Sequence, residues 1–310
     1  MLSIIIPCYN VASYLDRCLQ GVVKLDNEDL EIICINDGST DDTLELLNAW
    51  KVKDSRLQVY TKVNGGLSDA RNFGLAKSCG DAVFFLDSDD ELVTTRFEKA
   101  YQLFCLEGFD MLQFGRIIID ENSQVIGSQS KSVDFVKKSS LIKYYADGRI
   151  TSTVWDKIYK KEILVEFLKG KLHEDHYFMP KVLTNAKNCA IIDDGIVRYR
   201  QRKGSIMDVW KDERFHILEA QLVFRRDFYS VLDKTSLNKR VLKYLIICYH
   251  WYLDSTDSTD LYIDKLTRLI SKSEILNLLR YAGYRDKLLG LIIILGWDKY
   301  IKIFKSYVRK

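Results

Sequence analysis

The chain has 310 residues and a mass of 36.1 kDa, enough for one large α/β domain with an appendage. Hydrophobic residues make up 47% and charged residues 29% of it, a composition that excludes a mostly disordered chain. The formal net charge is only +3, so we expect no nucleic-acid partner.

The cysteines and the apolar runs indicate where the protein resides. Seven cysteines are scattered without a Cys-x-x-Cys pair, which predicts reduced, mostly buried thiols. No signal peptide precedes the first apolar run, which begins at residue 2. The longest uncharged apolar run near the end, residues 288–297, has about half the roughly 20 residues of a membrane-spanning helix. We therefore expect a cytoplasmic protein, soluble or peripherally bound to a membrane.

The first 90 residues alternate short apolar runs with amphipathic segments. Apolar runs predict four strands, at residues 2–7, 31–36, 57–62 and 82–86. The segments between them predict helices that begin at Asn10, at Ser39 (with Asp42 as an acidic variant of a capping box) and at Ser68. This alternation predicts a mostly parallel sheet with helices on both faces.

The pattern is looser in the rest of the chain. Residues 111–120 and 190–200 predict two more strands, and residues 173–186 predict a helix entered through acids. Beyond about Arg214 the sequence is helical in pattern to its end.

Polar clusters follow the predicted strands, at Tyr9-Asn10, Asp37, residues 64–66 and residues 87–89. Ligands of parallel α/β sheets bind beyond the carboxyl ends of the strands. The coincidence predicts a ligand site at that edge.

Three acids follow the fourth strand. If the backbone stays extended past Leu86, Asp87 and Asp89 point to one side and Ser88 to the other. Two neighbouring carboxylates suit Mg²⁺ or Mn²⁺, which fills its other positions with water and substrate phosphates. The alternative is a solvated acidic turn that caps the next helix.

Three other side chains have a binding and a structural interpretation each. Asp37 suits hydrogen bonds from a base or ribose, or a helix-capping turn. Arg71 suits a phosphate or carboxylate, or a helix surface. Tyr9 suits stacking on a base, or half-burial as an ordinary aromatic.

Together, these motifs resemble the GT-A fold, family-2 nucleotide-sugar glycosyltransferases. The matching stretches are SIIIPCYNVASYLDRCL, INDGSTDDT, NGGLSDARNFGL, FFLDSDD, VWDKIYKKE, HEDHYF and YRQRKGSI. They cover residues 2 to about 206, so the resemblance implies a Rossmann-like α/β catalytic domain at 1–206. Residues 207–310 would form a helical region, associated with a membrane or with the acceptor.

The resemblance also implies roles for single residues. The nucleotide-sugar would contact Pro7, Tyr9, Asn10, Asp37, Asp69, Arg71, Asp87 and Ser88. Tyr9 and Asp37 would hold the nucleoside, which the resemblance implies to be uridine, and Asp69 and Arg71 would lie against its uracil. Asp89 would bind the metal directly. Trp155 would line the acceptor side, and Arg202 and Ser205 would close over the diphosphate.

The implied reaction is an inverting, metal-dependent transfer from a UDP-sugar to a hydroxyl of a saccharide or lipid-linked acceptor in polysaccharide synthesis. A positioned carboxylate must take the hydroxyl proton, and Asp175 aligns with the family's general base. Helix geometry lets only one of Asp175 and its neighbour Glu174 face the cleft. His173 and His176 lack the zinc-protease spacing and are expected to be polar residues beside the helix.

The basic end of the chain has two interpretations. Residues 285–310 hold seven Lys or Arg and two Asp or Glu, interleaved with aromatics. Such a helix suits an anionic membrane surface, or an apolar face packed on the domain with solvated lysines.

Two other functions share parts of this pattern. A sugar-phosphate nucleotidyltransferase would need a Gly-rich, basic loop after the first strand, which residues 7–14 lack. A non-catalytic nucleotide-sugar binder keeps the fold, but the intact Asp89 and Asp175 favour an enzyme.

Overall fold

The computed structural model describes residues 1–130, 132–202, 215–254 and 268–280. It contains two compact units, Met1–Ser205 and Ile206–Lys310, divided beside the boundary that the resemblance implies. Among the described residues, no helix is both long and apolar enough to cross a membrane.

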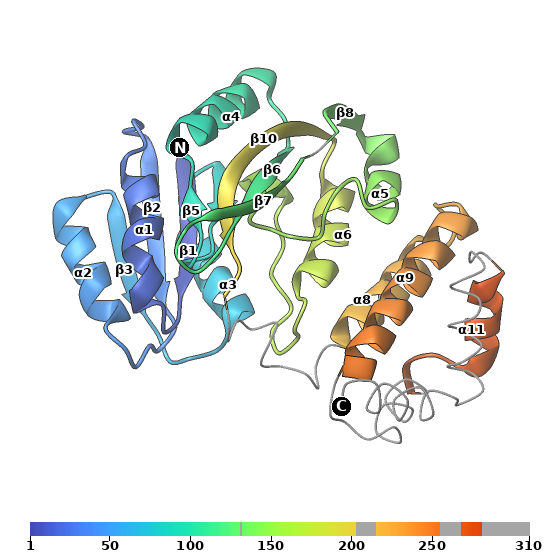
Figure 1. The fold of residues 1–310 in the computed structure, drawn as a ribbon. Helices are drawn as coiled ribbons and strands as arrows, with labels where there is room; N and C mark the ends of the chain where they lie inside the picture. Colours follow the sequence, from blue (N-terminus) through green and yellow to red (C-terminus); the bar gives the residue numbers. More distant parts are fainter. Residues whose placement is uncertain (131, 203–214, 255–267, 281–310) are drawn as a thin grey trace. The chain divides into compact units, whose positions relative to one another are not determined.

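The first unit is an α/β structure around one large sheet (Figure 1). In the described residues the strand order is β3-β2-β1-β4-β9-β6-β10-β5, with β7 on β6 and β8 on β10. The strands are β1 (Leu2–Cys8), β2 (Leu30–Asn36), β3 (Leu57–Thr61), β4 (Ala82–Phe85), β5 (Glu91–Leu92), β6 (Met111–Ile119), β7 (Val125–Gln129), β8 (Asp134–Lys137), β9 (Lys157–Lys160) and β10 (Asn188–Arg200).

The helices of this unit connect and cover the strands. They are α1 (Ala12–Val23), α2 (Thr43–Lys53), α3 (Leu67–Lys77), α4 (Thr94–Glu107), α5 (Lys138–Ala146), the short 3₁₀ helix η1 (Lys161–Ile163) and α6 (Asp175–Asn185). The strands predicted at residues 111–120 and 190–200 and the helix predicted at 173–186 are confirmed as β6, β10 and α6.

Strands β1 to β4 confirm the predicted parallel sheet. β1 pairs in parallel with β2 and with β4, and β2 pairs in parallel with β3. Every residue of β1, β2 and β4 is buried, as expected for parallel strands covered on both faces. Ile4 and Ile6 share a buried cluster with Leu15 of α1, whereas Ile5 faces α3, where a Cβ added at Gly74 would overlap its side chain.

The other half of the sheet is mixed. β9 pairs antiparallel with both β4 and β6, whereas β6 and β10 are parallel. The sequence analysis missed β9 because this central strand begins with a lysine and not with an apolar residue. Lys157 is nevertheless fully buried, and it donates to Asp156 Oδ1 at 2.5 Å and to Thr151 Oγ1 at 2.7 Å.

The predicted helix caps are wrong in detail. α1 begins after Val11, and Asn10 does not cap it; Asn10 Oδ1 instead accepts from the Thr40 amide at 2.8 Å. The first-turn amide of Ala12 donates to Asp41 Oδ2 at 3.1 Å. α2 begins at Thr43 rather than at Ser39, and α3 begins at Leu67 with Gly66 at its N-cap. The loops after β1 and β2 therefore hydrogen-bond to each other at the site edge, and Asp41 of the second loop caps the first turn of α1.

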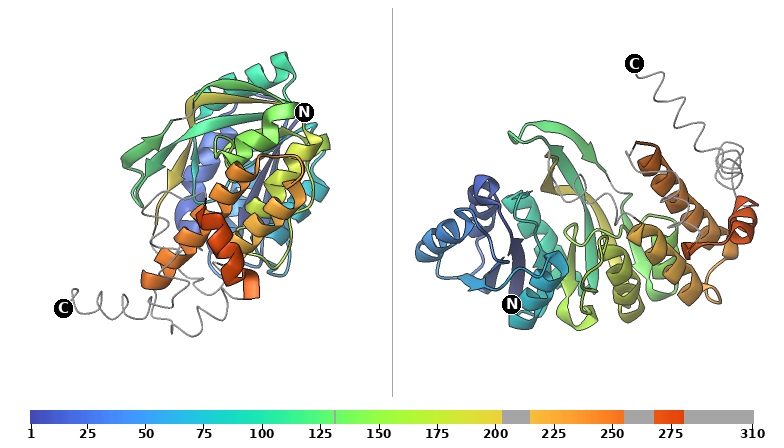
Figure 2. Two further views of the ribbon diagram at one scale, coloured as in Figure 1. Left: turned by 90° about the vertical axis from the view of Figure 1, so that its right-hand side faces the viewer. Right: turned by 90° about the horizontal axis from the view of Figure 1, so that it is seen from below.

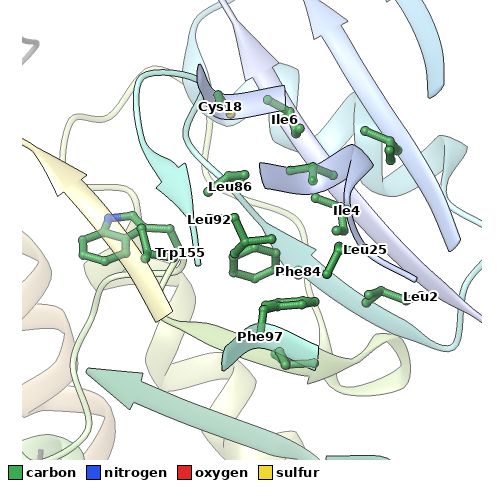
Figure 3. Packing of buried hydrophobic residues seen from close by; sticks show 14 of the residues in the cluster. Leu2, Ile4, Ile6, Cys18, Leu25, Phe84, Leu86, Leu92, Phe97 and Trp155 are labelled. Carbon is green, nitrogen blue, oxygen red and sulfur yellow. The ribbon is translucent and has the colours of Figure 1, made fainter. Parts of the chain in front are cut away.

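The core of the first unit extends along the whole length of these strands, from Leu2 at the start of β1 to Leu86 just beyond β4. At the carboxyl ends, Figure 3 shows Leu86 beside Leu92 and Ile6 near Cys18 of α1, with Trp155 at the margin of the same cluster. This packing holds the loops after β1 and β4 against α1.

The second unit is helical in its described part, as the sequence pattern predicts (Figure 2). It contains α8 (His216–Phe228), α9 (Lys234–Asp254) and α11 (Lys272–Leu279). Its own core includes Leu218, Leu242, Leu245, Ile275 and Leu278. The basic segment at residues 285–310 lies outside the described residues.

Candidate functional site

The predicted edge is built by the ends of β1, β2 and β4. Cys8 is in register with Asn36, so the loops that follow β1 and β2 begin side by side. Pro7 is a buried residue of β1, whereas Tyr9 just beyond it is 49% exposed. Asn10 has φ 50°, a left-handed conformation that asparagine tolerates. An exposed aromatic ring therefore stands at this edge.

Asp37 holds the loop that precedes α3. Its side chain is buried; Oδ1 accepts from Lys62 Nζ at 2.5 Å and from the Gly65 amide at 3.0 Å, and Oδ2 accepts from the Gly66 amide at 2.8 Å. Asp37 is therefore a loop anchor, whose Oδ2 accepts one hydrogen bond from the described residues and has a further acceptor position.

A chain of alternating charges extends from Asp37. Lys62 also pairs with Asp69 at 2.5 Å, and Asp69 pairs with Lys169. Hydrogen bonds from Lys169 and Lys62 lower the pKa of Asp69. Lys62 lies outside every motif of the sequence analysis, because a lysine at a strand end has no local signal that it will be placed between two carboxylates.

Residues 87–90, named here the acidic turn, follow β4. The strand ends at Phe85, and the Asp90 amide donates to the Asp87 carbonyl at 3.0 Å. The extended backbone assumed for these residues is therefore wrong. The turn nevertheless leaves the Asp87 and Asp89 side chains 25% and 23% exposed and buries Ser88 and Asp90.

Arg71 joins the acidic turn to the acids at the start of α6. Its side chain is buried; Nη2 donates to Asp87 Oδ1 at 2.8 Å and Nη1 donates to Glu174 Oε1 at 2.5 Å. The alternative of an arginine on a helix surface is thereby excluded. One cation positions carboxylates that are 87 residues apart in the chain, from Asp87 to Glu174.

The two acids at the start of α6 differ in environment. Asp175 is half-buried, and its Oδ1 accepts from the His176 amide at 2.8 Å. Burial raises the pKa of Asp175, while His173 and Arg71 oppose that rise. Glu174 is buried, and burial raises its pKa to about 7 against the opposing charge of Arg71. Asp175 is thus the more accessible of the pair, and Glu174 is the partner of Arg71.

The end of β10 holds the acidic turn from the other side. Arg202 Nε donates to Asp89 Oδ2 at 2.7 Å. The buried Arg200 donates from Nε to the Asp89 carbonyl at 2.8 Å and from its amide to Asp90 Oδ1 at 2.8 Å. The sequence analysis missed Arg200, although it lies in the matched YRQRKGSI stretch. Ser205 lies outside the described residues.

Trp155 is only 5% exposed. Its ring stacks on that of Tyr199, with centroids 5.1 Å apart and planes at 4°. The indole is therefore part of a packed aromatic pair beside the site, and Tyr199 is the more exposed ring.

The acidic turn can accommodate a divalent cation together with a phosphate ligand. Asp87 and Asp89 each use one oxygen for an arginine, and both side chains reach solvent. Within the described residues, no group of three or more His, Cys, Asp or Glu forms a metal cage. Two carboxylates without a full cage match Mg²⁺, which is commonly bound through one or two carboxylates plus substrate phosphates.

Comparisons with known proteins identify the relatives of this chain. The family described as "Glycosyl transferase family 2" matches residues 3–165. Over 228 residues the chain is 29% identical to glycosyltransferase GlyA of Streptococcus pneumoniae. The aligned region is 70% of this chain but only 33% of the length of GlyA. Over 246 residues it is 27% identical to glycosyltransferase GlyG of the same organism, covering 76% of this chain and 79% of GlyG.

A solved structure has the same fold. The crystal structure of S. aureus TarS 1-349 in complex with UDP-GlcNAc superposes with a TM-score of 0.74 at 19% identity, covering 99% of this chain and 91% of that one.

Proposed function

The chain belongs to glycosyltransferase family 2, and on that premise we propose that it transfers a sugar from a UDP-sugar to a hydroxyl of a saccharide or lipid-linked acceptor in polysaccharide synthesis. We propose further that the transfer needs Mg²⁺ or Mn²⁺ and inverts the anomeric carbon.

One observation carries this proposal. Arg71 binds Asp87 of the acidic turn and Glu174 beside the candidate base, at 2.8 and 2.5 Å. The buried guanidinium keeps the donor-binding carboxylates and the base at a set separation. A displacement at an anomeric carbon needs that arrangement, with the leaving group on one side and the base on the other.

The choice of UDP has two supports. TarS, which shares the fold, was crystallised with UDP-GlcNAc and with UDP. The exposed ring of Tyr9 stands at the edge where the loops after β1 and β2 meet, and it can stack on a base.

The acidic turn supports the metal dependence. Asp89 would bind the ion directly and Asp87 would face the ribose or a bound water. When bound, the ion would neutralise charge on the leaving diphosphate. Arg202, which lies on Asp89 in this structure, is a second cation near the same place.

Asp175 would remove the proton from the acceptor hydroxyl. Burial raises the pKa of Asp175 above that of an ordinary aspartate, which is the direction that makes a carboxylate a better proton acceptor. A single base and no enzyme nucleophile lead to inversion.

The test is a UDP-release screen over UDP-sugars and acceptors with Mg²⁺ or Mn²⁺. EDTA should abolish the release, and Asp89→Ala should lower it by about 100-fold or more, since the ion contributes several kcal/mol. Asp147→Ala, at an exposed aspartate after α5, is the control and should behave as wild type. Release that is insensitive to EDTA would contradict the metal dependence. Donor binding without turnover over a broad acceptor screen would indicate a non-catalytic binder.

We also propose that the basic end of the chain contacts a membrane surface, which would bring the enzyme to a lipid-linked acceptor. The support is compositional: lysines interleaved with aromatics over residues 285–310. Liposomes with anionic lipid should carry the full chain upward in a flotation gradient, and removal of residues 285–310 should reduce that binding. Equal flotation of both proteins would contradict the membrane contact.

A further inference from the structure

Arg116 of β6 is an arginine without an acceptor. Among the described residues nothing accepts a hydrogen bond from it, and its Nε is buried and unpaired. The other arginines of the site have acceptors. Arg71 binds two carboxylates through its Nη groups, although its Nε is likewise buried and unpaired. Arg202 binds a carboxylate, and the side chain of Arg200 binds a carboxylate and carbonyls. A buried donor without an acceptor is costly, and Arg116, unlike Arg71, has no acceptor for its other guanidinium N–H groups among the described residues. Its donors are therefore available to a ligand group.

The guanidinium of Arg116 lies on the aromatic pair. Its Cζ is 5.2 Å from the ring centroid of Trp155 and 5.2 Å from that of Tyr199. Arg116 is in register with Val197, so Tyr199, two residues further along β10, projects on the same face. The two rings hold the guanidinium by cation–π contact without using its N–H donors.

This cation stands next to the proposed catalytic site. Burial raises the pKa of Tyr199, the carboxylates of the acidic turn raise it further, and the Arg116 guanidinium lowers it. Tyr199 is therefore within electrostatic reach of both the acidic turn and Arg116. The geometry agrees, because the peptide amide that follows Tyr199, that of Arg200, donates to Asp90 Oδ1 of the acidic turn at 2.8 Å.

We propose that Arg116, with Trp155 and Tyr199, forms an acceptor subsite for an anionic group, a phosphate or a carboxylate on the acceptor. The inference rests on the proposed function and names the acceptor class. A planar guanidinium with free N–H groups matches both kinds of oxyanion, and an aromatic face beside it suits a sugar ring. The donor side of the site has its own cation, Arg202 on Asp89, so Arg116 is left for the acceptor.

The test observes the Nε–H resonance of Arg116 in ¹⁵N-labelled full-length protein, assigned by its loss in Arg116→Lys. UDP and Mg²⁺ are added first to fill the donor site. Glycerol 1-phosphate, methyl glucuronide and neutral methyl glucoside are then titrated separately. At least one anion should move the Arg116 resonance saturably, and the glucoside should not. The anion that binds more tightly identifies phosphate or carboxylate as the recognised group.

Variants give the size of the effect. With the Trp155 indole N–H as reporter, Arg116→Met should weaken anion binding by about 10- to 100-fold, the loss expected for hydrogen bonds to a charged group. Arg116→Lys keeps the positive charge and should lose less anion affinity than Arg116→Met. Arg96→Met removes an exposed arginine of α4 whose Nη1 donates to the Gly195 carbonyl, and it should leave anion binding unchanged.

Three outcomes would overturn the inference. The first is that neither anion moves the resonance, and the second is that the anions move all arginine resonances alike. The third is that UDP alone saturates the Arg116 response, which would assign Arg116 to the donor. Backbone amides report UDP binding in the same sample. Absence of UDP binding would contradict the proposed function, whereas UDP binding without an anion response contradicts the acceptor subsite alone.

Discussion

Asp175→Asn is expected to lower sugar transfer by about 10²- to 10⁴-fold while UDP binding remains near the wild-type value. Asparagine has nearly the same shape and keeps an oxygen for the His176 amide, which donates to Asp175 Oδ1 at 2.8 Å. What it loses is the ability to accept a proton. Single-turnover transfer rates and the UDP dissociation constant, measured on the same preparation, separate these two effects.

The pH profile of the wild type supplies a second measurement. Burial raises the pKa of Asp175, and it raises that of Glu174 to about 7. A base must be ionised to act, so activity should be present at high pH and fall as the pH drops through the apparent pKa values of this pair. Asp147→Asn should keep the wild-type profile. Full transfer by Asp175→Asn to a proven acceptor would show that another group is the base.

Arg71→Met is expected to cost about 3–5 kcal/mol of unfolding free energy and to abolish transfer, because it leaves the buried Glu174 without its partner. Asp87 of the acidic turn would lose its contact as well. Denaturant unfolding measures the stability, and UDP release measures the activity. Arg71→Lys keeps the charge but cannot bridge two carboxylates with one planar group. Its stability and its activity should therefore lie between those of the wild type and those of Arg71→Met.

A double variant tests the cause of that loss. Arg71→Met with Glu174→Gln removes the cation and the buried charge together, so it should recover part of the stability without recovering transfer. Arg96→Met, at an exposed arginine, is the control for the loss of one positive charge. Wild-type stability of Arg71→Met would contradict the bridging role.

The parallel half of the fold follows from local patterns. The apolar runs that form β1, β2 and β4 are buried along their whole length, and such runs are visible without any knowledge of their neighbours. Parallel strands end at a common edge, so Asp37 and Asp87 could be assigned to one site from the order of the elements alone. β5, with two residues, and β9, which contains lysines, have no such local signal.

The sequence by itself determined the fold class, the family resemblance, and the edge at which the acidic turn and Asp37 gather. Only the tertiary structure decided what each charged side chain contacts. Arg71 had two interpretations, and its bond to Glu174, 103 residues away, selected one. Lys157 and Arg116 were not considered at all. The physical reason is that burial of a charge is tolerated only where partners or aromatic faces surround it, and those neighbours come from segments that are distant in the chain.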